Sequence, residues 1–248
     1  AANPVNLVDL SGFAWNYDDQ KNGATAHIAF SAWALMKGKI PTLDFPLRSV
    51  AKAYGEKLFD SDPRGGALKP DAVSFADRTY FELKPISHRG SYLQSDDIEQ
   101  LKSYATGLAS HGFRGGNQLD LSNGKTVIAI VPGTDGREYA LVLEPADTSN
   151  HALDGLVYYY ARQLPRGFTR PQPAPIPAFP LKPGLADDLK QKGIVLLSNA
   201  SAIDVENRLW ADNVNFYTST FLVTSVIAAD IGIGIALGIS VLNASMSG

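Results

Sequence analysis

Residues 69–85, KPDAVSFADRTYFELKP, constrain the fold of this chain more than any other stretch. Two short runs with β-strand character, 72–76 and 79–83, are separated by only two residues. Such a gap is typical of a tight β-hairpin, although its Asp-Arg pair makes a poorer turn than Asn-Gly. The second strand carries an acid and a base, Glu82 and Lys84, two positions apart. The pattern therefore predicts antiparallel strands with charge on one face.

The hairpin also predicts a register. If the turn falls at Asp77 and its neighbour, Asp71 lies opposite Lys84. Glu82 then lies opposite Val73. Directly opposed residues share a face and side chains alternate along each strand, so the two acids and the lysine emerge on one side of the sheet. The other side, which we expect to be the packed one, carries Ala72, Ser74, Phe81 and Leu83.

The two carboxylates on this face need a cation between them. Like charges a few ångström apart raise a pKa unless an opposite charge lies close. Lys84 neutralises part of the negative charge. Mg2+ would neutralise more of it, because this ion binds carboxylate oxygens and keeps several waters. A metal-bound water beside a lysine provides the nucleophile and the positive charge needed to hydrolyse a phosphodiester. The alternative interpretation is an exposed strand face with an ion pair between Asp71 and Lys84, and with Glu82 as a neighbour.

The order of these residues resembles the PD-(D/E)xK nuclease superfamily, which has the restriction-endonuclease-like fold. A Pro-Asp pair is followed, eleven residues after Asp71, by Glu-Leu-Lys. Members of the superfamily found among polymorphic bacterial toxins and secreted effectors are similar over a longer stretch, LKPDAVSFADRTYFELKP followed by DDIEQLKSYATGL. Those members read KPD, ELKP and a downstream QLxxY. The resemblance covers residues 46–145.

The resemblance implies metal-dependent cleavage of nucleic acid. Asp71 and Glu82 would be ligands of Mg2+, with Mn2+ as a possible substitute. The main-chain carbonyl of Leu83 would add a third ligand, as the middle residue of the motif does in the superfamily. Lys84 would be the catalytic lysine.

Three further residues bear on the implied site. Gln100 and Tyr104 match the downstream element and are four residues apart on one helix, so they could reach the strand ends together. The alternative is a surface Gln beside a half-buried Tyr. Many members also place an acid on the first core helix, where Glu56 is the only candidate. Glu56 points away from the apolar face of its helix, and we leave it out of the predicted site.

The hairpin is flanked by predicted helices. One lies around residues 24–36, and a second follows Pro46, a residue suited to the first helical position. Ser95 can cap a third helix, whose first turn carries acids favourable at the positive helix end. The apolar face of the second helix comprises Leu47, Val50, Ala51, Tyr54 and Leu58. The buried stripe of the third comprises Ile98, Leu101, Ala105 and Leu108.

Later segments complete an α/β pattern. The run 125–131 is continuously apolar, which predicts a central strand buried on both faces. A strand at REYALVLE and a helix near 151–164 follow. This order predicts a mixed sheet flanked by helices. With the resemblance, we expect a restriction-endonuclease-like core with N-terminal helical and C-terminal hydrophobic extensions.

Four regions are expected along the chain. An N-terminal extension spans 1–45 and the nuclease core spans 46–164. Residues 165–183 are Pro-rich and predict a linker or an extended arm. Residues 184–248 form a hydrophobic region that packs on the core or binds a partner. Its last part, 213–248, contains two uncharged stretches around one Asp, so a membrane-active hairpin is the alternative.

The amino-acid composition argues against several kinds of binding site. A net charge of −3 gives no general affinity for polyanions, so a nucleic-acid site must be local. The chain has no cysteine, which excludes disulfides and thiolate zinc sites. Its four histidines are far apart, and we expect each to be structural or on the surface. The opening AANPVNLVDL does not predict a signal peptide, and the chain is expected to be a piece of something longer.

The leading prediction is a Mg2+-dependent nuclease, a DNase toxin domain of an antibacterial effector. The resemblance implies delivery from a bacterium, action in the target-cell cytoplasm and a cognate immunity protein. The substrate is expected to be DNA, with RNA as the other polymer. The alternatives are a membrane-active toxin that uses residues 213–248 and a catalytically silent nucleic-acid-binding domain.

Overall fold

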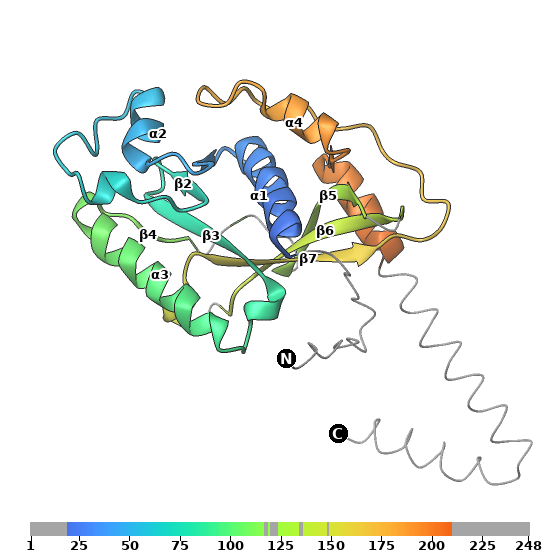
Figure 1. Ribbon diagram of the computed structural model, residues 1–248, viewed down its shortest axis with the longest axis horizontal. Helices are drawn as coiled ribbons and strands as arrows, with labels where there is room; N and C mark the ends of the chain where they lie inside the picture. Colours follow the sequence, from blue (N-terminus) through green and yellow to red (C-terminus); the bar gives the residue numbers. More distant parts are fainter. Residues whose placement is uncertain (1–18, 117–118, 120–123, 134–135, 148, 210–248) are drawn as a thin grey trace, which may run out of the picture. The chain divides into compact units, whose positions relative to one another are not determined.

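The computed structural model describes residues 19–116, 119, 124–133, 136–147 and 149–209 (Figure 1). The chain divides into two compact units between Ile203 and Asp204, and the architecture given below is that of the first unit. The hydrophobic segment 213–248 that suggested a membrane hairpin lies outside the described residues. Within the described part, no helix is long and apolar enough to cross a membrane.

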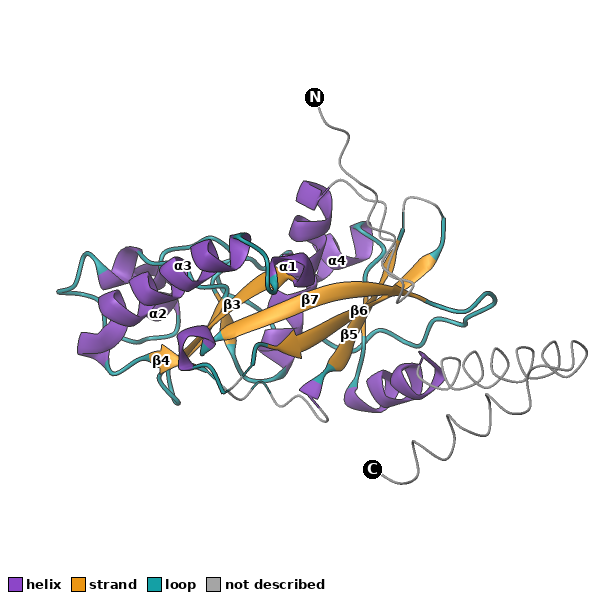
Figure 2. Cartoon of the chain, turned by 90° about the horizontal axis from the view of Figure 1, so that it is seen from below, coloured by secondary structure: helices purple, strands orange, loops and turns teal. Residues whose placement is uncertain are grey.

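A mixed and strongly curled sheet forms the centre of the unit (Figure 2). The strand order is β1-β2-β3-β7-β6-β5-β8, and β4 pairs with the start of β3. The β3–β7 and β3–β4 pairs are parallel and the other pairs are antiparallel. The strands are β1 (Ile40–Pro41), β2 (Ala72–Ser74), β3 (Thr79–Pro85), β4 (Arg114–Gly115), β5 (Thr126–Pro132), β6 (Glu138–Pro145), β7 (Leu156–Gln163) and β8 (Val195–Leu196). The predicted α/β class is confirmed.

Helices cover both faces of this sheet. The α-helices are α1 (Asp19–Met36), α2 (Leu47–Ala53), α3 (Leu93–Leu108) and α4 (Leu185–Gln191). Short 3-10 helices lie at η1 (Gly65–Ala67), η2 (Ile86–His88), η3 (Ala109–His111) and η5 (His151–Leu153). One apolar core joins α1 and α4 to the sheet, and a second joins α2 and α3 to it. Strand β3 contributes to both cores, because its successive side chains point to opposite faces.

The β2–β3 hairpin differs from the predicted one. Val73 pairs with Tyr80 and Ser74 with Thr79, so the turn is a wider loop over 75–78 and the register is shifted by two residues. The wider loop is stabilised by Asp77, whose carboxylate accepts a hydrogen bond from the Ser74 hydroxyl at 2.8 Å. A slip of two residues keeps every side chain on its predicted face, whereas a slip of one would have reversed them.

The expectation of a single packed face was wrong. Val73 and Tyr80 are buried against α2 and α3, and Phe81 and Leu83 are buried on the opposite face. Glu82 is only 4% exposed. The alternative of an exposed, ion-paired strand face is therefore excluded as well.

The helix predicted near 151–164 is instead the strand β7. It lies between β3 and β6 in the middle of the sheet, and six of its eight residues are buried. Its sequence, LVYYYARQ, is rich in aromatic and β-branched residues, which suit a strand. The apolar run 125–131 does form a strand buried on both faces, β5, but its outer neighbour is only the short β8, so it is less central than expected.

The boundaries of α2 and α3 differ from the predicted ones. Helix α3 begins at Leu93, and Ser95 lies inside it rather than at its cap. Its buried residues are Asp97, Leu101, Tyr104 and Leu108, while Ala105 is exposed. Helix α2 ends at Ala53, because the chain turns at Gly55 with a φ of 76° that only glycine adopts easily. Leu58 therefore lies beyond the helix.

The segments on either side of the predicted core contribute to the same sheet. In the first 45 residues, α1 packs in one of the two cores and β1 pairs with β2. The Pro-rich stretch 165–183 contains no helix or strand, yet Phe179 is buried within it and Ala174 donates a backbone hydrogen bond to Leu196. Beyond it, β8 pairs with β5.

Candidate active site

Strand β3 and helix α3 face each other through a row of polar side chains. The Tyr104 hydroxyl lies 3.1 Å from Oε2 of Glu82, as a donor. One turn earlier on α3, Oε1 of Gln100 accepts a hydrogen bond from Nζ of Lys84 at 2.8 Å. Nζ of Lys84 also lies 2.9 Å from Oε1 of Glu82. Residues four apart lie on one face of a helix, and residues two apart lie on one face of a strand. Tyr104 and Gln100 of α3 therefore contact Glu82 and Lys84 of β3, respectively.

Asp71 joins this row from the position just before β2. Its Oδ2 accepts the backbone N–H of Leu83 at 2.7 Å, at the point where β2 has ended and β3 continues. The N–H and C=O of one strand residue point to the same side, so the Leu83 carbonyl faces the edge that Asp71 occupies. The two carboxylates lie close enough for the charge of Asp71 to act on Glu82.

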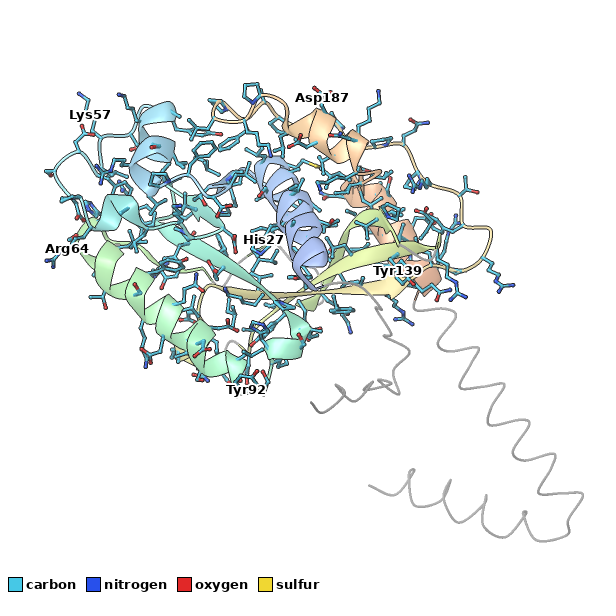
Figure 3. The ribbon with its side chains drawn as sticks, viewed as in Figure 1. His27, Lys57, Arg64, Tyr92, Tyr139 and Asp187 are labelled. Atoms are coloured by element: carbon cyan, nitrogen blue, oxygen red, sulfur yellow. The ribbon has the colours of Figure 1, made fainter. Side chains whose placement is uncertain are left out.

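His27 is a member of the site that the sequence did not reveal. It projects from the side of α1 that faces β3 (Figure 3), and its Nδ1 lies 2.7 Å from Oδ1 of Asp71. Burial lowers the pKa of His27, but the hydrogen bond and the charge of Asp71 outweigh burial and leave the pKa above its ordinary value. Spacing gives no sign of this contact, because the two residues are 44 positions apart.

The site concentrates negative charge in a buried place. Burial first, and then the charge of Asp71, raise the pKa of the Glu82 carboxyl above its ordinary value, against the opposing effect of Lys84. Burial lowers the pKa of Lys84, yet the neighbouring carboxylates, Glu82 foremost, raise it overall. Lys84 is therefore held as an ammonium ion, and its single charge is shared among several carboxylates.

Asp97 and His88 form the end of the row. Asp97 is 3% exposed, and its Oδ2 lies 2.9 Å from Nδ1 of His88. Its Oδ1 lies 4.0 Å from Nζ of Lys84. The sequence predicted Asp97 only as one of the acids in the first turn of this helix. The spacing of Asp97 with Leu101, Tyr104 and Leu108 was the available signal, because these positions recur at three or four residues on one helix face.

The donor set fits a hard divalent cation. Each ionised carboxylate offers about four lone-pair sites, so Asp71 and Glu82 keep acceptor capacity beside their present partners. The carbonyl of Leu83 supplies another hard oxygen, the ligand type that Mg2+ prefers. Among the described residues, no group of three or more His, Cys, Asp or Glu side chains is placed to hold a metal ion. Mg2+ keeps several waters in its coordination shell, which suits a site of two carboxylates and a carbonyl.

The largest described cavity, of about 510 Å³, lies elsewhere. It is lined by residues at the start of β3, including Thr79, and by Lys39 and Arg114. None of the predicted catalytic residues lines it. The candidate site is instead a packed polar row between β3 and α3.

The structure brings the predicted site residues together and adds three others. Direct contacts join Glu82, Lys84, Gln100 and Tyr104, while Asp71 is connected to them through the backbone N–H of Leu83. The added residues are His27, His88 and Asp97. Glu56 follows the end of α2 and takes part in none of these contacts. Searches of family models, curated proteins and solved structures find no match to this chain. The chemical interpretation therefore depends on the residues themselves.

Proposed function

We propose that this chain is a metal-dependent nuclease that hydrolyses phosphodiester bonds. The observation that carries the proposal is the convergence of Asp71 and Glu82 beside Lys84 at the end of the β2–β3 hairpin. Burying carboxylates is unfavourable unless positive charge compensates them. Lys84 is shared between Glu82 and Asp97, and His27 compensates Asp71 only when its ring is protonated. A binding site for a divalent cation accounts for the remainder.

Each polar residue has a role in this proposal. Asp71, Glu82 and the carbonyl of Leu83 would hold Mg2+, or Mn2+ in its place. The bound ion would polarise the phosphate and lower the pKa of a coordinated water. Lys84, held by Gln100, orients the attacking water and stabilises the charge that develops on the phosphate oxygens.

Tyr104 and His27 keep the carboxylates in place. The Tyr104 hydroxyl contacts Glu82, and His27 contacts Asp71. Carboxylates that bind metals are usually fixed by such hydrogen bonds, and loss of the fixing residue weakens metal binding.

A restriction-endonuclease-like core is part of the proposal. In its favour, the chain forms an antiparallel hairpin that carries the acids and the lysine, then a helix over the same face, α3, then a strand parallel to β3. Many members of the superfamily carry an acid on the first core helix, whereas here Glu56 follows α2 and His27 of α1 contacts Asp71.

The proposed biological role is based on the sequence resemblance to nucleases found among bacterial toxins and effectors. We propose a DNase toxin domain, delivered from a bacterium into the cytoplasm of a target cell and neutralised by an immunity protein. The net charge of −3 is modest, and so binding to DNA is expected to be weak and strongly dependent on salt. RNA is the competing substrate.

Digestion assays test the proposal. Plasmid DNA and total RNA are incubated with the chain in Mg2+, in Mn2+ and in EDTA, and the same lanes are run for Glu82→Gln and Lys84→Met. Cleavage should require metal and should fall at least about 100-fold in both variants. Glu99→Gln is the matched control, because Glu99 is an exposed acid on α3. Folded protein that cuts neither polymer with either metal would refute the nuclease.

A further inference from the structure

Asp97 and His88 form a pair that the proposed metal site does not use. Asp97 is a buried acid, and such groups are rare in protein interiors unless a partner compensates them. Both of its oxygens lie near Nδ1 of His88, at 2.9 Å and 3.2 Å. A carboxylate only accepts hydrogen bonds, so Nδ1 must be the donor. The other ring nitrogen, Nε2, is left as the nitrogen that can exchange a proton.

The pair lies in line with the catalytic row. Along α3, Tyr104 contacts Glu82 and Gln100 contacts Lys84, and one turn earlier Asp97 contacts His88. Oδ1 of Asp97 lies within 4.0 Å of the Lys84 ammonium and 3.2 Å of His88 Nδ1. His88 therefore extends the row one step beyond Lys84.

His88 is also accessible, unlike its partner. Its side chain is 21% exposed, whereas that of Asp97 is 4% exposed. A buried acid that accepts a hydrogen bond from a partly exposed imidazole fixes the tautomer and the orientation of that ring. The next residue, Arg89, is engaged elsewhere, since it pairs with Glu144 at 2.8 Å.

We propose that His88 is the general acid of the reaction, a role that rests on the proposed nuclease function. The oxygen of the attacking water forms a bond to phosphorus and its proton leaves to solvent. The bond from phosphorus to the leaving-group oxygen breaks, and that oxygen takes its electron pair together with the proton from Nε2 of His88. Asp97 positions the ring and stabilises its charge, and His88 recovers a proton from solvent. Lys84 remains an ammonium ion throughout.

Two substrates with different leaving groups test this role. A DNA oligonucleotide expels an alkoxide, which needs a proton, whereas a p-nitrophenyl ester of thymidine monophosphate expels a phenolate that is stable without one. His88→Asn keeps a donor near Asp97 but removes the acid. Its kcat on the oligonucleotide should fall about 100-fold or more, while its kcat on the nitrophenyl ester should stay within about threefold of wild type.

Three controls separate this role from a structural one. Asp97→Asn should show the same selective loss, and Asp96→Asn, on the exposed face of α3, should show none. Binding of Mn2+, measured by calorimetry, should be unchanged in His88→Asn, because the histidine holds no metal in this scheme. Melting curves show whether each variant is folded, and if His88→Asn does not fold, Asp97→Asn decides.

The outcomes are distinct. Equal losses on both substrates, or no loss on the oligonucleotide, would overturn the role of His88 while the nuclease proposal stands. If the wild-type chain cleaves neither substrate, the nuclease proposal fails and the role of His88 fails with it.

Discussion

The carboxylate of Asp71 accepts a hydrogen bond from the backbone N–H of Leu83 at 2.7 Å, so a side chain occupies the place where strand β2 would have continued. This contact fixes the acid of the Pro-Asp pair against the middle residue of Glu-Leu-Lys. It also explains how a shifted hairpin register still gives a compact site, because the bond joins a side chain to the backbone and does not require Asp71 to lie opposite Lys84.

Removing this acceptor should destabilise the fold. In Asp71→Ala the Leu83 N–H loses its partner, and an unsatisfied buried donor costs about 1–3 kcal/mol of unfolding free energy. Asp71→Asn keeps a carbonyl oxygen and should lose less. Urea denaturation measures both, with Asp96→Ala as the exposed control. Equal losses in the Ala and Asn variants would show that the hydrogen bond to Leu83 does not stabilise the protein.

Lys84 should be needed for stability as well as for cleavage. Breaking a buried ion pair costs about 3–5 kcal/mol, and the 20% exposure of the Lys84 side chain reduces this, so Lys84→Met should lose about 2 kcal/mol. The double variant Lys84→Met/Glu82→Gln should recover part of the loss, because it removes the uncompensated acid. Denaturation of the two single variants and the double variant forms a mutant cycle. A strictly additive cycle would contradict the coupling of these two residues.

Divalent metal should stabilise the protein through the same site. A ligand that binds only the folded state adds about 2.7 kcal/mol at 100 times its Kd, so Mg2+ or Mn2+ should raise the Tm of the wild-type chain. EDTA should reverse the shift. The Asp71→Asn/Glu82→Gln variant should show no shift, whereas Glu99→Gln should behave as wild type. A shift that persists in the double variant would place the metal elsewhere.

A second pair, Asp62 and His111, should give a dependence of stability on acid pH. Hydrogen bonds from the Gly65 N–H and then from His111 hold the pKa of Asp62 below its ordinary value. A lowered pKa contributes stability above the unfolded-state pKa of about 4, and that contribution is lost as the pH falls through the folded-state value. The Tm difference between wild type and Asp62→Asn should therefore be present above about pH 4 and shrink as the pH falls below it. Asp60→Asn is the control, and a difference that stays constant with pH would refute the assignment.

The local pattern of the hairpin predicted much of the site. Alternation along β3 placed Glu82 and Lys84 on one face, where both side chains contact α3. Asp71, which precedes β2, contacts the backbone of Leu83 and His27 of α1. Helical spacing likewise put Gln100 and Tyr104 within reach of β3. These predictions depended only on periods of two and of 3.6 residues, which the backbone sets locally.

Other features depended on contacts between distant segments. The sequence predicted a helix near 151–164, but pairing with both β3 and β6 made 156–163 the strand β7. The loop over 75–78 is wider than predicted because the Ser74 hydroxyl and the Asp77 carboxylate bond across it.

The sequence by itself determined the α/β class, the hairpin and the face that carries the acids and the lysine, because these follow from short-range periodicity. Only the tertiary structure decided that α3 buries this face, that His27 reaches Asp71 across 44 positions, and that Asp97 turns inward to hold His88. Burial and long-range hydrogen bonds arise when separate elements pack together, and their energy is not encoded in any one segment.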